Sequence, residues 1–277
     1  MWQEIEIKNW DHFNQYVTKL KPKNWVFRGQ SNVNWKLETS YYRALQFIKG
    51  IKSTVRSRSR DTYEEEIINQ FKSQYHLYLS YCPDDIAELI LDPASNNDKA
   101  KQVDRKLEWL SIMQHHGVPT RLLDWTFSPF VALFFALEFA TSTCCVYALN
   151  QSKLQKMDRD NLEPNYKAEL FSNSKGEKSF LRPYEPKIKN ERLVKQQGLF
   201  LVPSTNFETF DEILSLYHNF NNYAYKLIIN EKLRYDFHIM LRRQNITHES
   251  LFPGIDGFCR SLKFSLLESA NYLKRLS

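Results

Sequence analysis

The chain contains 277 residues, of which 42% are hydrophobic and only seven are glycine, and it carries a net charge of +6. Neither the Gly-x-Gly-x-x-Gly nor the Gly-x-x-x-x-Gly-Lys spacing occurs, which excludes the usual dinucleotide-binding turn and the phosphate-binding loop. The apolar stretch 130–149 is interrupted by polar residues and the N-terminus lacks a signal-peptide pattern, so we expect a cytoplasmic protein without membrane contact, whose positive charge favours an acidic partner such as nucleic acid.

Apolar periodicity and turn residues divide the chain into short helices and strands. Asp11 and Asp104 are placed to cap helices, Gly117 is a helix stop, and Ser128 with Pro129 forms an N-cap and first-turn pair. In chain order we expect a helix at 11–20, a strand at 25–28, helices at 37–47 and 63–81, a helix from 104 to 117, a strand at 121–126, a helix at 129–140, strands at 144–149 and 193–202, a helix at 208–218, a strand at 223–229, and helices at 231–243 and 257–276. Because no regular β-α repeat is present, the pattern predicts an α+β fold with a mixed or antiparallel sheet flanked by helices.

Two segments lack a clear period. The basic run 52–60 is interpreted as a solvated loop, with contact to a phosphate backbone as the alternative. Residues 151–190 are polar, charged and contain three prolines, so we expect an irregular insertion that acts as a lid, a binding loop or a partly disordered segment.

No metal site is expected. The four cysteines show no metal-ligand spacing and are interpreted as reduced, buried thiols. His115 and His116 are neighbours at a helix end, where their side chains diverge, and no third ligand stands at a familiar spacing.

The strand at 25–28 ends in a polar group of three residues, Arg28, Gly29 and Gln30. The guanidinium has the fork geometry that suits phosphate or carboxylate, and a glycine lets backbone or ligand approach closely. The alternative is a turn at a strand end with a surface arginine.

The densest polar run in the chain extends from Glu108 to Pro129. Glu108 and His115 are seven residues apart and share a helix face, and Asp124 and Thr126 share a strand face. Ser128 lies at a helix N-terminus, which is a natural anion site.

A purely structural interpretation of the same run stays open. In it Asp124 pairs with Arg121 or Arg28, His115 is a satisfied core histidine and Ser128 only caps its helix. Further on, Gln196 lies beside Gly198 on an expected strand and either satisfies backbone or reaches a ligand.

These segments together resemble the FRG domain family. The resemblance is carried by Phe-Arg-Gly-Gln at 27–30, the block from Glu108 through Gln114-His115, Gly117, Pro119-Thr120-Arg121-Leu-Leu-Asp124-Trp125-Thr126 and Ser128-Pro129, then Ala132-Leu133, Phe135-Ala136, Arg192, Gln196, Gly198, Phe200, Leu251-Phe-Pro and Asp256-Gly257. It implies a single FRG-type domain over 1–277, with 151–190 as an insertion. One departure is His116, where the family usually has tyrosine.

The order of three elements is also similar to that of ADP-ribosyltransferases: Arg28, then Thr126 and Ser128 before a helix bearing alanine and phenylalanine, then the Gln196 segment. This resemblance implies a split sheet, NAD as substrate, and a pyrophosphate and ribose site built from Arg28, Gly29, Gln30 and Ser128, with Asp124 and Thr126 shaping the nicotinamide pocket. Transferases carry a catalytic glutamate where this chain has Gln196 and Gln197. Glu108 or Asp124 is expected to supply that charge, with His115 as the base and Gln196 binding a ribose hydroxyl.

The leading hypothesis is therefore an enzyme that transfers ADP-ribose from NAD to nucleic acid or to a protein acceptor. The resemblance is typical of a bacterial toxin or phage-defence effector, which a partner protein would neutralise. Two alternatives remain: a non-catalytic module that binds a nucleotide or nucleic acid, and a nuclease or other hydrolase that uses His115 with Glu108 or Asp124. If the first hypothesis holds, Gly29, Gly117 and Gly198 mark the walls of the NAD cleft.

Overall fold

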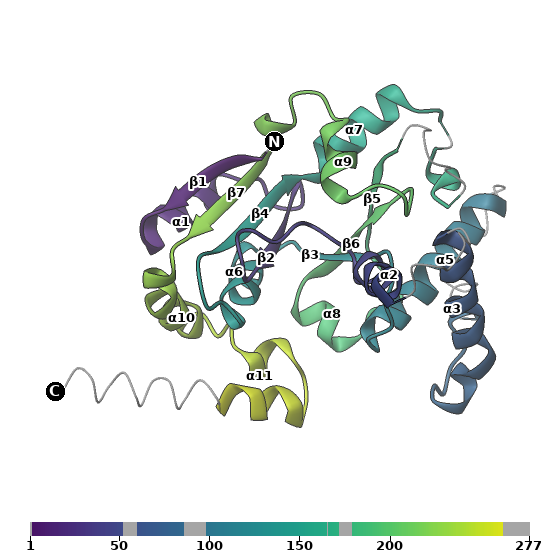
Figure 1. Cartoon of the computed structure of the whole chain (residues 1–277). Helices are drawn as coiled ribbons and strands as arrows, with labels where there is room; N and C mark the ends of the chain where they lie inside the picture. The colour runs from purple at the N-terminus through teal and green to yellow at the C-terminus, as the bar shows by residue number, and fades with distance from the viewer. Residues whose placement is uncertain (1, 52–59, 86–97, 165, 172–178, 263–277) are drawn as a thin grey trace.

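The computed structural model describes residues 2–51, 60–85, 98–164, 166–171 and 179–262. They form an α+β fold around one seven-stranded sheet (Figure 1). The helices are α1 (Trp10–Thr18), α2 (Ser40–Ile51), α3 (Arg60–Gln74), α5 (Asp98–His115), α6 (Pro129–Glu138), α7 (Gln151–Asn161), α8 (Glu191–Lys195), α9 (Phe210–Ser215), α10 (Arg234–Arg243) and α11 (His248–Leu251), with 3-10 turns η1 (Tyr75–Leu77), η2 (Tyr166–Glu169), η3 (Phe220–Asn222) and η4 (Glu231–Leu233).

The sheet is mixed, as the sequence predicts. Its strands are β1 (Gln3–Ile7), β2 (Trp25–Gln30), β3 (Leu123–Thr126), β4 (Cys144–Asn150), β5 (Leu181–Tyr184), β6 (Gly198–Pro203) and β7 (Ala224–Ile229), in the spatial order β1-β7-β4-β2-β3-β6-β5. β1 and β7 are parallel, and every other neighbouring pair is antiparallel.

The sheet divides between β2 and β3. These strands pair at a single position, Phe27 opposite Thr126, whereas β2 and β4 pair over six positions from Trp25 to Gln30. Because the strands are antiparallel, the residues of β2 after Phe27 diverge from the residues of β3 before Thr126. The sheet therefore has a four-stranded part and a three-stranded part, with an opening between them.

Helix α6 packs against the sheet beside this opening. It is apolar almost all round, and Val131, Ala132, Leu133, Phe134, Ala136 and Leu137 are buried. Ser128 accepts a hydrogen bond from Val131 N and Pro129 occupies the first turn, which confirms the predicted helix start. The burial of such a helix at the centre of the fold follows from its lack of a polar face.

A second apolar core lies under the three-stranded part. It joins α3 and α5 to β5 and β6 through residues such as Ile68, Leu107, Leu110, Tyr184 and Phe200. Figure 1 shows α3 and α5 side by side at the right of the molecule, away from β1 and β7. This second core therefore holds α5 in place, and the C-terminal end of α5 extends to the opening in the sheet.

Two predicted helix caps are wrong. Asn9, not Asp11, caps α1 by accepting from His12 N. Asp104 lies inside α5 and accepts from Arg182 instead. The stop at Gly117 is confirmed: its φ is +84°, and Val118 N donates to Met113 O at 2.9 Å, as in a Schellman cap.

Two segments differ from expectation in their secondary structure. Residues 151–190 are not irregular throughout, because they include α7, η2 and β5; their role as a lid stays a prediction. The expected strand 193–202 is a short helix, α8, followed by β6 from Gly198, so Gln196 caps a helix rather than lying on a strand. Asn190 caps α8 by accepting from Leu193 N at 2.7 Å, and this cap decides the local structure.

The basic run at 52–59 and the expected helix beyond 262 lie outside the described residues, although 255–262 is helical. Cys144 and Cys145 are buried, while Cys259 is exposed, against the expectation that it would be buried. Over the described ranges, no group of metal-ligating side chains and no helix suited to crossing a membrane is found.

Candidate functional site

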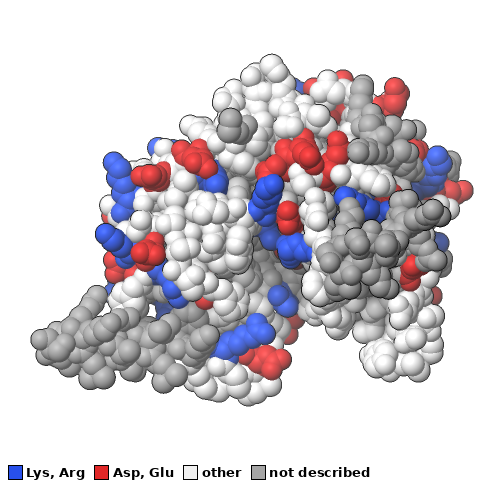
Figure 2. Space-filling view, in the orientation of Figure 1, with Lys and Arg blue, Asp and Glu red and all other residues white. Residues whose placement is uncertain are grey.

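A cleft of about 900 Å³ opens where β2 and β3 separate. Residues 28–30 of β2 line one side and residues 124–126 of β3 line the other, and the ends of α5, α6 and α8 complete the walls. This volume is within the range of small-molecule sites. Figure 2 shows a hollow at the centre of the molecule with blue Lys and Arg side chains along it.

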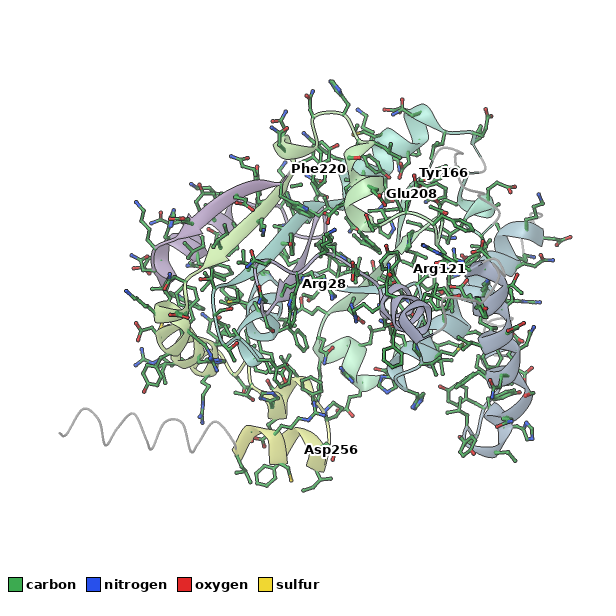
Figure 3. The ribbon with its side chains drawn as sticks, in the orientation of Figure 1. Arg28, Arg121, Tyr166, Glu208, Phe220 and Asp256 are labelled. Atoms are coloured by element: carbon green, nitrogen blue, oxygen red, sulfur yellow. The ribbon has the colours of Figure 1, made fainter. Side chains whose placement is uncertain are left out.

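Arg28 is the central charged residue of the cleft (Figure 3). Its Nη1 donates to the backbone oxygen of Asp124 at 2.6 Å, which joins the two sides of the opening. Its Nε is buried and has no hydrogen-bond partner among the described residues. Burial lowers the pKa of Arg28, the positive charge of Arg43 lowers it further, and Asp124 only partly offsets this. A buried guanidinium with an unused donor is a favourable place for an anionic ligand.

Asp124 is exposed and held by a short chain of hydrogen bonds. Thr120 Oγ1 donates to Gln114 Oε1 at 2.5 Å, and Gln114 Nε2 donates to Asp124 Oδ2 at 3.0 Å. Ser40 fixes the same loop, because Thr120 N donates to Ser40 Oγ at 3.0 Å. The contact with Thr120 sets the orientation of the amide so that its N–H group, not its oxygen, faces the carboxylate.

His115 and Arg192 line the cleft on the α5 and α8 side. Burial lowers the pKa of His115, and the charges of His116 and Arg192 lower it further. Burial also lowers the pKa of Arg192, while Asp124 and Glu138 raise it. His115 is therefore held in its neutral form near neutral pH, as a general base requires.

Glu138 also lines the cleft, but its carboxylate is already paired with His248. His248 Nε2 and Glu138 Oε1 are 2.8 Å apart, and both side chains are buried. Glu138 ends α6 and His248 begins α11, so this pair fixes α11 against the cleft wall.

The predicted site residues divide into two groups. Those that line the cleft are Arg28, Gly29, Gln30, His115, Asp124, Thr126 and Gln196. Glu108 and Ser128 are not among the lining residues. The buried Glu108 carboxylate accepts from Tyr184, Lys187 N and Ile188 N, so it fixes the chain after β5.

Thr126 and Gln196 have structural contacts inside the cleft wall. Thr126 Oγ1 donates to Gln196 O at 2.7 Å and accepts from Ser128 N at 3.0 Å. Gln196 Nε2 donates to Leu251 O at 3.2 Å. Gln30 Nε2 likewise donates to Lys36 O at 3.2 Å. These contacts hold the wall together, so these side chains shape the cleft more than they offer free donors to it.

The glycines line the cleft for different reasons. A Cβ at Gly29 would overlap Ala132 O and lie 2.5 Å from Ala136 N, so Gly29 admits α6 rather than a ligand. Gly117 adopts a left-handed backbone that ends α5. A Cβ at Gly198 would meet Leu193 of α8 at 2.6 Å. All three residues line one cleft, but each is required by the fold itself.

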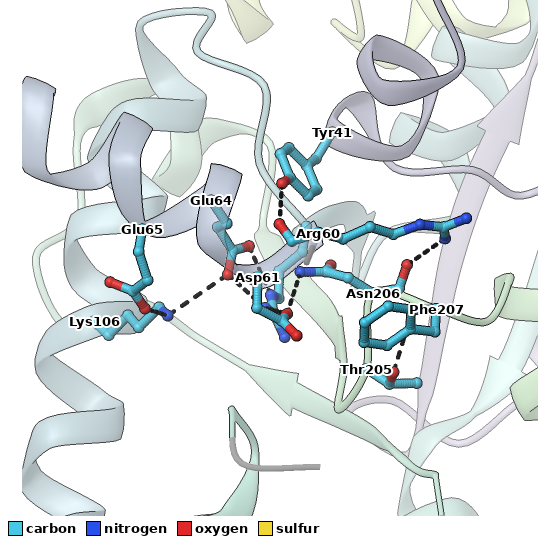
Figure 4. Close-up of polar contacts among 10 residues, drawn as sticks. Tyr41, Arg60, Asp61, Glu64, Glu65, Lys106, Thr205, Asn206 and Phe207 are labelled. Carbon is cyan, nitrogen blue, oxygen red and sulfur yellow. Dashed lines mark hydrogen bonds and ion pairs between the residues drawn. The ribbon is translucent and has the colours of Figure 1, made fainter. Parts of the chain in front are cut away.

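Arg121 lies away from the cleft in a buried ionic cluster. Its Nε and Nη2 both donate to the Glu64 carboxylate, and Nη2 also donates to Asp61 Oδ1 at 3.1 Å. Figure 4 shows Asp61, Glu64, Lys106 and Asn206 around this cluster. Asp124 therefore does not pair with Arg121, and its contact with Arg28 is through the backbone oxygen. The labels of Figure 3 show Arg28 and Arg121 apart, with Asp256 far from both.

Several cleft residues were not singled out from the sequence. Arg43 carries no motif, and only its position on α2 brings it to the wall. Gln114 was visible in the dense polar run, but its contact with Asp124 depends on the turn between them. Trp35, Lys36, Glu38, Glu138 and Phe139 are further examples.

Comparison with known proteins gives one finding. A family model described as the FRG domain matches residues 23–143. The matched range contains Arg28, His115 and Asp124, whereas Arg192 and the strands β4 to β7 lie beyond it. No curated protein and no solved structure matches the chain.

Proposed function

We propose that the FRG domain that this chain contains belongs to an enzyme that transfers ADP-ribose from NAD to a macromolecule, with an ADP-ribosyltransferase-like core around the divided sheet. The observation that carries the proposal is the covered Nε of Arg28, which has no hydrogen-bond partner among the described residues and lies at a cleft of suitable volume. The Arg28 guanidinium calls for a hydrogen-bond acceptor and a negative counter-charge beside it, and a pyrophosphate supplies both.

A carboxylate and a base face the same space. Asp124 is exposed, is oriented by Gln114, and is the predicted acidic residue that lines the cleft. Its negative charge would stabilise the positive charge that develops on the ribose as the glycosidic bond lengthens. Arg28 and Arg43 would hold the pyrophosphate at the other end of the substrate.

The bond between ribose C1′ and the nicotinamide nitrogen breaks, and its electron pair leaves with nicotinamide, which becomes neutral. A nucleophilic oxygen or nitrogen of the acceptor then forms a bond to C1′. Its proton passes to His115, whose lowered pKa keeps the imidazole neutral beforehand.

A nucleotide-binding module without catalysis is the second candidate. Glu108 is engaged with the chain after β5, Glu138 is paired with His248, and the expected third-strand glutamate is replaced by Gln196. Of the acidic residues singled out from the sequence, Asp124 lines the cleft, and it is the carboxylate on which catalysis depends in our proposal. If it does not act, the same cleft binds its ligand without turnover. Of the two forms of the hydrolase alternative, the one that uses His115 with Glu108 is not favoured, since Glu108 does not line the cleft, whereas the one that uses Asp124 is left to the test below.

The test uses the full chain with NAD labelled in its adenylate part, together with cell RNA, single-stranded DNA and protein. We expect nicotinamide release and transfer of label to one acceptor class. Arg28→Met and Asp124→Asn should each lower release by at least about 10-fold, the effect of losing one charge-assisted contact. Arg243→Met is the matched control, because Arg243 is exposed on α10 and does not line the cleft.

Four outcomes separate the candidates. Release that depends on Arg28 and Asp124 supports the transferase. Saturable NAD binding that is lost in Arg28→Met, without any release by the native chain, selects the binding module. Neither binding nor release contradicts both, and nucleic-acid shortening without NAD selects the hydrolase.

A further inference from the structure

Two aromatic side chains are exposed at the cleft although apolar residues of this size are usually covered. Trp35 is 59% exposed and Phe139 is 67% exposed, and both line the cleft. Neither has a ring contact with another aromatic side chain among the described residues. Exposed aromatic groups at the mouth of a site are typical of recognition surfaces.

The segments that carry these two residues are fixed to one another. Ser31 Oγ donates to Phe135 O at 3.4 Å, and Val33 N donates to Thr143 O at 3.0 Å. These contacts hold the loop with Trp35 against the end of α6 and the segment after it, where Phe139 is the C-cap. The two rings therefore belong to one rim of the cleft.

Two basic side chains lie beside this rim. Lys36 follows Trp35 directly and is exposed, and Arg43 on α2 is exposed and lines the same cleft. Arg43 Nη1 donates to the backbone oxygen of Glu38 at 2.6 Å. Aromatic rings beside cations match a chain of nucleotides, whose bases stack on rings and whose phosphates pair with Lys and Arg.

We propose that Trp35 and Phe139 form a base-stacking rim that receives single-stranded nucleic acid as the acceptor. This rests on the proposed transferase, for which it names the acceptor class. The rim is open to solvent and the chain carries a net charge of +6, which suits a polyanion that continues beyond the cleft. Stacking needs unpaired bases, so a duplex of the same sequence fits the rim less well.

Binding is measured by fluorescence anisotropy of labelled single-stranded RNA and DNA of about 12 nucleotides, with the matching duplexes. Trp35→Ala and Phe139→Ala should each weaken single-strand binding by about 5- to 150-fold, the usual effect of losing one stacked base. Trp35→Phe keeps a ring and should bind nearly as the native chain does. Phe47→Ala is the matched control, because Phe47 is 72% exposed but does not line the cleft.

Tryptophan fluorescence gives a second measurement that does not depend on affinity alone. The other five tryptophans are buried or half-buried. Stacking at Trp35 should therefore quench the native emission on oligonucleotide addition, and Trp35→Phe should lose that quenching while it keeps binding.

The outcomes of this test differ from those of the NAD test. Ring-dependent binding of single strands supports the rim whether or not NAD is cleaved, and nicotinamide release that persists in Trp35→Ala shows that the Trp35 ring is not needed for NAD cleavage. Equal binding by Trp35→Ala, Phe139→Ala and the native chain overturns the proposal. Quenching of Trp35 by NAD alone, without oligonucleotide binding, also overturns it, because the rim then serves the dinucleotide.

Discussion

Arg121 is fully buried and Arg28 is half-buried with its Nε covered, and the two arginines differ in how their charges are paired. Two carboxylates surround Arg121, and although burial lowers its pKa, the charge and hydrogen bonds of Glu64 and Asp61 more than offset this and raise it. Arg28 has a backbone oxygen, a nearby like charge and an unused Nε, and its pKa is lowered. The Arg121 charge is paired within the chain, whereas the Arg28 Nε has no hydrogen-bond partner among the described residues.

The charge and hydrogen-bond partners of the two arginines distinguish a structural residue from a candidate site residue more clearly than their burial does. Both arginines come from polar sequence motifs, and both are surrounded by protein. The hydrogen-bond donors and acceptors around each arginine distinguish them: those of Arg121 are paired within the fold, and on our proposal Arg28 completes its contacts with a ligand. Substitutions that remove each charge should therefore have different consequences.

The largest loss of stability is expected for substitution of Arg121, whose charge is paired within the chain. Arg121→Ala leaves Glu64 buried without its main partner and should lower the free energy of unfolding by about 3–5 kcal/mol, measured by urea denaturation. The double variant Arg121→Met with Glu64→Leu should recover most of that loss, because neither buried charge then remains. A loss below about 1 kcal/mol in the single variant would contradict the structural role.

Asp158 is another buried ionisable group; it does not line the cleft, and no ion pair to it is found among the described residues. Burial raises its pKa to about 7, although Tyr217 OH donates to Oδ1 at 2.8 Å. The folded chain then binds a proton more tightly than the unfolded chain, so stability is highest below about pH 4 and falls as the pH rises to 7.

Asp158→Asn should remove this dependence. Between pH 5 and pH 8 the native chain should lose about 2–3 kcal/mol relative to the variant, as urea titrations at each pH would show. Parallel curves for the two proteins would mean that Asp158 is ionised throughout. Glu163→Gln, an exposed carboxyl in the chain after α7, is the control.

Substitution of Gly29 measures how tightly β2 packs against α6 in the cleft wall beside Arg28, for comparison with the cluster around Arg121. Gly29→Ala should cost about 1–3 kcal/mol, because the new Cβ meets the α6 backbone, which cannot move as a side chain can. Gly117→Ala has open space around it and should cost about 1 kcal/mol through its left-handed backbone alone. If thermal unfolding shows the reverse order, close packing of α6 on β2 is not the reason for Gly29.

The smallest change in stability is expected for Arg28. Arg28→Met removes one hydrogen bond to a backbone oxygen but also a buried charge beside Arg43, so the free energy of unfolding should change by less than about 1 kcal/mol. If the proposed NAD site is correct, NAD or ADP-ribose should raise the Tm of the native chain and leave that of the variant unchanged. A strongly destabilised Arg28→Met would place Arg28 with Arg121 as a structural residue.

Local chemistry made part of this arrangement predictable from sequence. Ser128 and Pro129 define a helix start by themselves, and the polar ends of 25–30 and 121–126 marked both sides of the cleft. Glu108 was not predictable in the same way, since its partners come from residues 184–188, far along the chain. The exposure of Trp35 also depends on the packing of distant segments, which periodicity does not report.

The pairing of β1 with β7 has a consequence for synthesis of the chain. Glu4 and Lys226, which form an ion pair across these strands, are 222 positions apart. During translation β4, which is buried along nearly its whole length, therefore remains an unprotected apolar edge until residues 224–229 have emerged. A transcript cut short before that point would yield an aggregation-prone fragment rather than a smaller working protein.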